Sequence, residues 1–413
     1  STKNGSWYVL FGSGPTAVGT NTVSYKSSNA KIFVFDLRTG KGPGGAGDPT
    51  ELDIGASGVA VGDMTAVDFD SDYQVDNIYF GTYGGTGVSQ TGKFYRLRIR
   101  NGDSSYFAPA SWVIETVVVP GTTADGRPIF AASEVAQDTA GTKWLYFGTG
   151  LYLSLEHAGI TSQCSNDSTK SCTSSDDCSG NACNEISGYL EYLYGVKETD
   201  ACWKSGGASC TYTNFLDTSN IKFTGAKAVE AGCFCAGQLM STISCDSDGT
   251  CPGSCGTNKV CSNNTSQSCA ADSDCPTGAA GLCVDNKVIL KVNNASITNT
   301  GPTSPYDCTN KIDTDAITCI ENNINASNGC SGASCKGWRR AIKGQKMFSK
   351  PFVAGGLANY TSFQPTSTVC SLGGNAHLIS LHYTTGTAYV QPTIFLAGGT
   401  SGSTTSLTIS ASV

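Results

Sequence analysis

The stretch Trp7-Tyr-Val-Leu-Phe-Gly-Ser-Gly14 decides the fold, because close copies of it recur along the chain. The second copy is Asn77-Ile-Tyr-Phe-Gly-Thr82, and the third is Lys143-Trp-Leu-Tyr-Phe-Gly-Thr-Gly150. The Phe-Gly pairs of the three copies are separated by 69 and 67 residues. Runs of aromatic and β-branched residues closed by glycine are typical of β-strands. Their recurrence at a nearly fixed period predicts a repeated sheet.

A second strand pattern follows each copy. These patterns are Lys31-Ile-Phe-Val-Phe-Asp-Leu37, Lys93-Phe-Tyr-Arg-Leu-Arg-Ile99 and Tyr192-Leu-Tyr-Gly-Val-Lys197, with a weaker fourth copy at Leu378-Ile-Ser-Leu-His-Tyr383. We therefore predict an all-β fold: a β-propeller or part of one, since radial repetition of blades leaves few sheet edges open. The alternative is a β-sandwich whose strands are similar by chance.

Cysteine content indicates an oxidising compartment. The chain has 20 cysteines, of which 19 lie between Cys164 and Cys335, and the last is Cys370. So many cysteines favour disulfides over free thiols or metal ligands. Two cysteine-rich segments repeat one another: the spacing that begins Cys164-Ser-Asn-Asp recurs from Cys261-Ser-Asn-Asn. If all are oxidised, Cys370 must pair into the cysteine-rich region, and Cys335 is the partner we expect.

These patterns divide the chain into five segments. We predict propeller blades over 1–158, a cysteine-rich insertion over 159–188, a propeller strand over 189–199, a second cysteine-rich insertion over 200–338, and further blade structure over 339–413. The chain enters at what the repeat indicates is the second strand of a blade. We therefore expect an upstream segment of the same precursor, or another chain, to complete the propeller.

An acidic loop between two predicted strands carries the sharpest chemical motif, Asp68-Phe-Asp-Ser-Asp-Tyr-Gln-Val-Asp76. Its carboxylates occupy positions 1, 3, 5 and 9 of an EF-hand-like calcium loop, and position 7 would give a backbone carbonyl. The predicted Ca²⁺ ligands are Asp68, Asp70, Asp72, Gln74 and Asp76. Two positions depart from the motif, since Tyr73 replaces the usual glycine and Tyr79 replaces the usual glutamate. The alternative is a solvated acidic turn.

Charge and motifs exclude other classes. The net charge is −7 and no run of lysine and arginine occurs, so we expect no nucleic-acid partner. The sequence has no Gly-x-Ser-x-Gly, His-Glu-x-x-His or Cys-x-x-Cys-His motif. We therefore do not expect an enzyme.

The ordered succession of these blocks resembles the C-terminal domain of the PilY family. Besides the segments above, the resemblance rests on Arg127-Pro-Ile-Phe-Ala-Ala, Gly337-Trp-Arg, Lys350-Pro-Phe-Val and Phe363-Gln-Pro-Thr-Ser-Thr-Val-Cys370. It covers about 7–387 apart from the cysteine-rich insertions. The resemblance implies a distorted, quinoprotein-like propeller with a calcium loop at Asp68–Asp76.

The resemblance also implies a function. Proteins of this family act at the tip of bacterial type IV pili in adhesion, pilus assembly and control of retraction and twitching motility. The expected partners are minor pilins and the N-terminal part of the same precursor, together with an unspecified surface receptor, and the expected location is extracellular, at the cell surface or pilus tip. Two alternatives stay open: a quinoprotein-like propeller enzyme, and a structural extracellular coat or filament component.

Overall fold

The computed structural model describes most of the strand-rich part of the chain and only pieces of the cysteine-rich part. The described residues are 6–20, 22–85, 90–103, 105–121, 126–154, 157, 162–165, 167–171, 182–185, 190–207, 210–228, 233–235, 244–245, 255–256, 259–261, 264–268, 283–285, 287–299, 305–309, 311, 313–330, 333–365, 374–388 and 394–397. The chain divides into two compact units, the first formed by 1–221, 302–307 and 320–389 and the second by the remainder.

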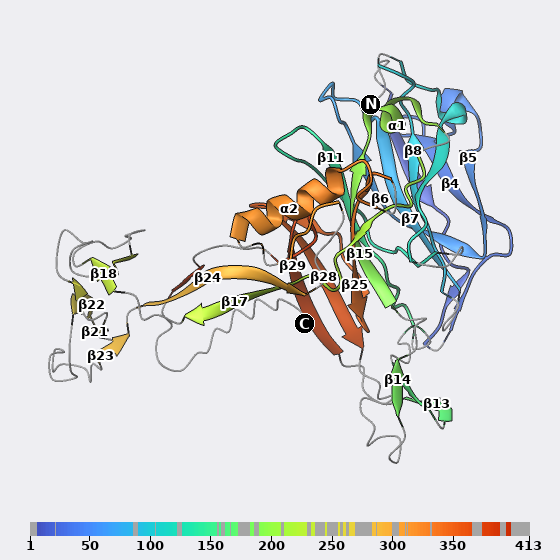
Figure 1. The fold of residues 1–413 in the computed structure, drawn as a ribbon. Helices are drawn as coiled ribbons and strands as arrows, with labels where there is room; N and C mark the ends of the chain where they lie inside the picture. Colours follow the sequence, from blue (N-terminus) through green and yellow to red (C-terminus); the bar gives the residue numbers. More distant parts are fainter. Residues whose placement is uncertain are drawn as a thin grey trace. The chain divides into compact units, whose positions relative to one another are not determined.

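Four antiparallel sheets, numbered here in chain order, form most of the first unit (Figure 1). The first sheet consists of β1 (Tyr8–Gly12), β4 (Asn29–Asp36) and β5 (Thr50–Ser57). The second sheet consists of β6 (Val59–Val67), β7 (Asn77–Gly84), β8 (Phe94–Arg98) and β9 (Val113–Val118). The short strands β2 (Ala17–Val18) and β3 (Val23–Ser24) form a hairpin between β1 and β4 in the sequence.

The other two sheets contain longer connections. The third sheet consists of β10 (Glu134–Gln137), β11 (Lys143–Gly148), β15 (Leu190–Glu198), β25 (Gly337–Lys343) and, joined in parallel, β16 (Leu216–Asp217). The fourth sheet consists of β26 (Lys346–Met347), β27 (Phe352–Ala354), β28 (Leu357–Pro365) and β29 (Gly374–His382). The repeated sequence segments thus become equivalent strands, with β1, β7 and β11 each hydrogen-bonded to the strand of the second pattern.

Successive sheets pack face to face, and the Phe-Gly pair explains how. Phe80 lies in the core between the first and second sheets, and Phe147 lies in the core between the second and third sheets. The glycine after each Phe points to the other face of its sheet. A Cβ on Gly81 would lie 2.3 Å from the Cβ of Ile129, and one on Gly148 would lie 2.2 Å from Met347. β7 and β11 therefore each present a bulky ring to the preceding sheet and an empty position to the segment that follows.

The cysteine-rich repeat also forms equivalent structure. In the first unit, β12 (Ser162–Cys164) pairs with β13 (Asp167–Ser171) and β14 (Cys183–Glu185). In the second unit, β21 (Lys259–Cys261) pairs in the same order with β22 (Asn264–Ser268) and β23 (Cys283–Asp285). The registers correspond residue by residue, since Cys164 lies opposite Cys183 as Cys261 lies opposite Cys283. The repeat predicted from cysteine spacing is thus present in the backbone.

The second unit contains two further small sheets. One is formed by β17 (Lys222–Ala228), β24 (Lys287–Asn299) and β30 (Ile394–Ala397). The other is formed by β18 (Cys233–Cys235), β19 (Ser244–Cys245) and β20 (Cys255–Gly256).

The described residues also include short helical segments. The α-helices are α1 (Asp200–Ser205) and α2 (Asp313–Asn325), and the 3₁₀ turns are Pro43–Gly45 and Pro109–Ser111. In the part of the chain that the structure describes, no helix is both long enough and apolar enough to cross a bilayer.

Three disulfides lie among the described residues: Cys202–Cys210, Cys308–Cys319 and Cys330–Cys335. The expected pairing of Cys335 with Cys370 is therefore wrong. The partner of Cys335 is Cys330, five residues away, at an S–S distance of 2.03 Å. Such a local pair costs little loop-closure entropy. Cys370 lies outside the described residues.

The all-β prediction is confirmed at the level of fold class. Strands in several antiparallel sheets dominate the described residues, and none of these sheets closes on itself. The face-to-face succession of four sheets is the arrangement that blades have in a propeller. A complete propeller stays a prediction.

Candidate metal centre

The acidic loop connects β6 to β7 and brings three of its carboxylates together. Asp68, Asp70 and Asp76 each offer an oxygen within 4.8 Å of those of the other two. Asp76 is fully buried, whereas Asp70 is exposed. The backbone fixes Asp76 at the start of the hairpin, since its N–H donates to the Val67 carbonyl at 2.9 Å. The loop is thus anchored at its buried end and open at the other.

The backbone turns sharply at Tyr73, although EF-hand loops have glycine at this position. Tyr73 has φ +66°, in the left-handed region where EF-hand loops place glycine. The Asp68 carboxylate accepts hydrogen bonds from the backbone N–H groups of Asp72, at 3.2 Å, and Tyr73, at 2.8 Å. These bonds hold the loop in a tight curve although position 6 is not glycine.

Asp72 and Gln74, the other predicted ligands, face a different set of partners. Asp72 is not one of the three clustered carboxylates, and its Oδ2 accepts a hydrogen bond of 2.7 Å from the Tyr106 hydroxyl. The Gln74 side chain donates to the same carboxylate at 3.1 Å. The Oε1 of Gln74 is buried without a hydrogen-bond partner among the described residues. One neutral oxygen beside the carboxylates is therefore left unsatisfied.

Arg100 supplies a positive charge to the cluster, and no sequence motif indicated it. Its Nη1 lies 2.5 Å from Asp70 Oδ2 and 2.6 Å from Asp76 Oδ1. The guanidinium also lies 5.2 Å from the Trp203 ring centre and 5.6 Å from that of Tyr106. The register of the β7–β8 hairpin brings Arg100 here, because its N–H donates to the Asp76 carbonyl at 3.0 Å. In the sequence, the only indication would have been the pairing of the aromatic residues in the predicted hairpin. Continuing this pairing away from the turn places Arg100 beside Asp76.

The pKa values of two loop carboxylates shift in opposite directions. Burial raises the pKa of Asp76, and the hydrogen bonds from Arg100 and Phe69 only partly offset it. For Asp72, burial also acts to raise the pKa, but hydrogen bonds from Tyr106 and Gln74 outweigh it, so that the pKa is lowered. The negative charge at the buried end of the loop is thus only partly compensated.

The donor set fits a hard cation such as Ca²⁺, which takes carboxylate and amide oxygens. One guanidinium faces three carboxylates, so an excess of negative charge remains. Arg100 contacts two of the three, and a cation bound between Asp68 and Asp70 would require its Nη1 to move away from Asp70. Arg100 is buried but Asp70 is exposed, so the Asp70 carboxylate can turn away from Nη1 and make this separation without opening the core.

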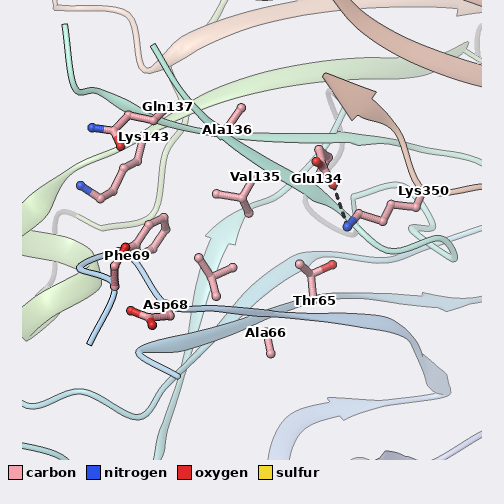
Figure 2. Close-up of a pocket in the computed structure, with 12 residues that line it drawn as sticks. Thr65, Ala66, Asp68, Phe69, Glu134, Val135, Ala136, Gln137, Lys143 and Lys350 are labelled. Atoms are coloured by element: carbon pink, nitrogen blue, oxygen red, sulfur yellow. Dashed lines mark ion pairs between the residues drawn. The ribbon is translucent and has the colours of Figure 1, made fainter. Parts of the chain in front are cut away.

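An open pocket of about 420 Å³ lies beside the loop (Figure 2). Its walls are the end of β6, the first residues of the loop and β10. Lys143 and Lys350 lie at opposite ends of it, and Lys350 is paired with Glu134 at 2.7 Å. The Lys143 ammonium lies 5.5 Å from the centre of the Phe69 ring. Because Asp68 lines the pocket, the loop is reachable from solvent on this side.

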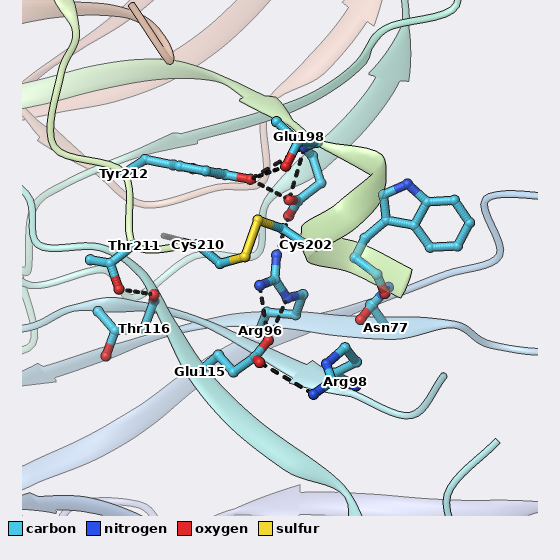
Figure 3. Close-up of a disulfide and its surroundings, with 12 residues drawn as sticks. Asn77, Arg96, Arg98, Glu115, Thr116, Glu198, Cys202, Cys210, Thr211 and Tyr212 are labelled. Atoms are coloured by element: carbon cyan, nitrogen blue, oxygen red, sulfur yellow. Dashed lines mark hydrogen bonds and ion pairs between the residues drawn. A yellow bond between two sulfur atoms is a disulfide. The ribbon is translucent and has the colours of Figure 1, made fainter. Parts of the chain in front are cut away.

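Behind the loop, a buried charge network joins the second sheet to the third (Figure 3). Arg96 is fully buried, and its guanidinium contacts Glu198 at 2.7 Å and Glu115 at 2.9 Å. The hydroxyls of Tyr79 and Tyr212 donate to Glu198 at 2.8 Å and 2.6 Å. The buried charges of Arg96 and Glu198 are thus paired with each other and with further polar groups, as buried charges require.

The disulfide Cys202–Cys210 cross-links the segment between β15 and β16, and Tyr212 of the network follows two residues after Cys210 (Figure 3). The same segment includes α1, whose Trp203 stacks on the Arg100 guanidinium. The acidic loop and the buried network are therefore supported by one cross-linked segment.

Comparisons of this chain with protein-family models, with curated proteins and with solved structures gave no match.

Proposed function

We propose that the chain is a calcium-stabilised β-repeat module of a bacterial type IV pilus-tip protein of the PilY type. It would act in adhesion, pilus assembly and control of retraction. The observation that carries the proposal is the convergence of Asp68, Asp70 and Asp76 within 4.8 Å, in a loop between two strands of a repeated sheet. The pilus-tip role itself rests on the ordered sequence blocks that resemble this family.

The geometry supports calcium at the outer end of the loop. Asp68 and Asp70 offer carboxylate oxygens there, and Asp72, which accepts a hydrogen bond from the Gln74 side chain, lies in the same loop. Ca²⁺ takes six to eight oxygen ligands at about 2.3–2.6 Å, including waters. Asp72 would join the set by exchanging its hydrogen bond from Tyr106 for the metal.

Bound calcium would hold the connection between β6 and β7. β7 is buried along its whole length at the centre of the second sheet, and the N–H groups of Ile99 and Arg100 donate to the Asp76 carbonyl. A cation on this loop would therefore fix the start of β7 and the end of β8 together. The pilus machinery would meet a rigid scaffold, which is how recognition loops are commonly presented.

Location and partners follow from the same proposal. Three disulfides among the described residues support an oxidising compartment, and hence the cell surface or pilus tip. Minor pilins and the N-terminal part of the same precursor would be the assembly partners. A surface receptor would bind the loops.

Calorimetric titration with Ca²⁺ tests the metal site. We expect the double variant Asp68→Asn, Asp70→Asn to weaken binding more than about tenfold, which corresponds to about 1.4 kcal/mol. The asparagines keep the size of the side chains and leave the pair of Asp76 with Arg100 in place. The matched control is Asp103→Asn, because Asp103 is an exposed acid nearby that pairs with Lys204 at 2.9 Å. Unchanged affinity in the double variant would remove the calcium assignment.

The pilus role needs a separate experiment in cells. We expect the double variant to change pilus number or twitching motility, while Asp103→Asn leaves both as in the wild type. Normal pili, motility and attachment in cells lacking the whole protein would contradict the pilus-tip role, whatever the calorimetry shows.

A further inference from the structure

The two equivalent cysteine-rich sheets each place one cysteine directly opposite another. In the first unit, Cys164 of β12 is the register partner of Cys183 of β14. In the second unit, Cys261 of β21 is the register partner of Cys283 of β23. Each of these paired strands is three residues long. So short a sheet gains little stability from backbone hydrogen bonds alone, and a cross-link between its strands would compensate.

A third cysteine-rich sheet shows the same arrangement twice. Its central strand β18 has the sequence Cys233-Phe-Cys235. On one side, Cys245 of β19 lies opposite Cys233, and on the other side, Cys255 of β20 lies opposite Cys235. In these three sheets, every cysteine of a described strand thus has another cysteine as a register partner.

The spacing of antiparallel strands suits a disulfide between register partners. Directly opposite residues have Cα atoms about 4.5 or 5.5 Å apart, depending on whether they form a hydrogen-bonded pair. The Cα atoms of a disulfide are usually about 4.4–6.8 Å apart. In Cys202–Cys210, Cys308–Cys319 and Cys330–Cys335 these distances are 5.5, 5.7 and 5.2 Å. Register partners therefore lie within the range that a disulfide needs.

Register also selects one of the three pairings that four cysteines allow in the third sheet. Cys245 and Cys255 lie on opposite sides of β18, so their Cα atoms are two strand spacings, or about 9–10 Å, apart. Diagonal neighbours such as Cys233 and Cys255 are about 7–8 Å apart. Cα atoms more than about 7 Å apart cannot be bridged without backbone movement. Only the pairing between register partners is left.

The alternative for the third sheet is a metal site. Register partners share one face of a sheet, as do positions i and i+2 of a strand, so its four cysteines lie on one face. Four thiolates can bind Zn²⁺. Oxidation is favoured instead, because the six other cysteines among the described residues all form disulfides. The two equivalent sheets also repeat the register pairing with two cysteines each, which are too few for a structural zinc site.

We propose that the register partners in these sheets form four further disulfides: Cys164–Cys183, Cys261–Cys283, Cys233–Cys245 and Cys235–Cys255. In each, two thiols lose two protons and two electrons as one S–S bond forms. A protein disulfide of the oxidising compartment accepts the electrons by thiol–disulfide exchange and becomes a dithiol. The two equivalent sheets are then one cross-linked module used twice. The inference depends neither on the calcium site nor on the pilus-tip role.

Peptide mapping of the protein purified from its native cells without reductant tests the proposal on the unmodified sequence. The protein is unfolded in denaturant that contains N-ethylmaleimide, so that every free or metal-bound thiol is blocked. Digestion with pepsin in acid follows, because thiol–disulfide exchange is slow where thiolates are protonated. Pepsin cleaves next to phenylalanine, and cleavage at Phe234 separates Cys233 from Cys235. Mass spectrometry with fragmentation of the S–S bonds then identifies both peptides of each link, with Cys308–Cys319 as the control link.

We expect all four links and no maleimide on the eight cysteines. A link from any of them to a cysteine other than its register partner would overturn the proposal. Maleimide on the four cysteines of the third sheet, together with bound zinc in elemental analysis of the native protein, would overturn it in favour of the metal site.

Thiol counting in variants gives a second measurement. The double variant Cys261→Ser, Cys283→Ser removes both members of one proposed pair, so the maleimide count should stay that of the wild type. The double variant Cys164→Ser, Cys283→Ser is matched in composition but removes one member from each of two pairs, and its count should rise by two per chain. Equal counts in the two double variants would contradict the pairing.

Discussion

Glu198 illustrates how single residues hold the sheets together. Its carboxylate is fully buried and accepts hydrogen bonds from Arg96, Tyr79 and Tyr212. Burial and the neighbouring carboxylate raise the pKa of Tyr79 well above its ordinary value, so its hydroxyl stays a donor at neutral pH. Removing one partner from such a network leaves an uncompensated charge, which is more costly than losing the pair.

We expect Glu198→Gln to lower the free energy of unfolding by about 3–5 kcal/mol. The amide keeps the shape of the side chain but leaves Arg96 with only Glu115 as a counter-charge. Glu51→Gln breaks the surface pair with Lys31 and should cost less than about 1 kcal/mol. Urea unfolding of both variants measures the difference. Equal losses would show that the buried network does not stabilise the fold.

Lys197 should make the stability of the folded chain depend on pH. Burial lowers its pKa to about 8, although Asp138 and Glu321 act in the opposite direction. Its ammonium lies 5.5 Å from the centre of the Trp144 ring. The unfolded chain holds this proton more tightly than the folded chain does. The folded state is therefore penalised below pH 8, and the penalty disappears as the pH rises from about 8 to 10.5.

Lys197→Met should accordingly stabilise the protein at pH 7, by about 1–2 kcal/mol. At about 1.4 kcal/mol per pKa unit, the full shift of the Lys197 pKa would correspond to a larger stabilisation. We expect a smaller one because Lys197 keeps some solvent contact. The advantage of the variant should shrink as the pH rises from 7 to 10. Thermal unfolding at several pH values checks this, with Lys41→Met at an exposed position as the control. A difference that stays constant with pH would refute the assignment.

At the scale of elements, the Phe-Gly pair sets the spacing between neighbouring sheets. Gly81 is approached by Ile129, including its backbone carbonyl at 2.4 Å from an added Cβ. Gly148 is approached by side chains only, chiefly that of Met347 at 2.2 Å. A methionine side chain can change rotamer, whereas a backbone carbonyl cannot move without shifting its segment.

Gly81→Ala should therefore destabilise the protein more than Gly148→Ala. We expect losses of about 3 kcal/mol and about 1 kcal/mol, within the range of overpacked cores. Chemical unfolding of the two variants measures the order. Met347→Ala combined with Gly148→Ala should cost less than the sum of the two single changes, because the shared clash is then absent. The reverse order of the two glycine variants would contradict this account of the repeat.

The strands that the sequence predicted best are those with repeated aromatic patterns. β1, β7 and β11 lie where the Phe-Gly copies predicted them, because each strand is rich in aromatic and β-branched residues; β1 and β11 end at the glycine of the pair, whereas β7 continues to Gly84. The equivalent cysteine-rich sheets were likewise indicated by spacing alone. Such features are local, and local features can be recognised in a sequence.

Features that depend on distant partners could not be predicted in the same way. Arg100 reaches the acidic loop through hairpin register, and charge patterns do not specify register. Parity of the cysteine count indicated only that Cys370 pairs into the cysteine-rich region and could not select Cys335, because proximity determines disulfide pairing and favoured Cys330 as the partner of Cys335. The helix α1 and its stacking of Trp203 on Arg100 arise in a segment that composition placed in an insertion.

At the scale of the whole molecule, the first unit is a succession of sheets that share cores in pairs. The second sheet has apolar contacts on both faces, through one core with the first sheet and another with the third. The first sheet shares a core on one face only, among the described residues. Local stability follows buried apolar contacts, so sheets of similar composition should differ in how readily they open.

We expect amide hydrogen exchange in the isolated chain to be faster in β4 than in β8. Each of the two strands has a hydrogen-bonded neighbour on both sides, and each carries the second repeat pattern. Their backbone hydrogen bonding is therefore comparable. The two strands differ in the burial of their side chains. Phe33 and Phe35 of β4 contact solvent, while the equivalent Tyr95 and Leu97 of β8 are buried. Opening of β4 therefore gives up apolar contacts on one face, and opening of β8 gives up contacts on two. Exchange followed by mass spectrometry on peptides covering each strand measures the ratio, with β15 as a second doubly covered strand. Equal protection of β4 and β8 would mean that one covered face is sufficient, and the stability of the unit would then have to come from within each sheet and not from the contacts between them.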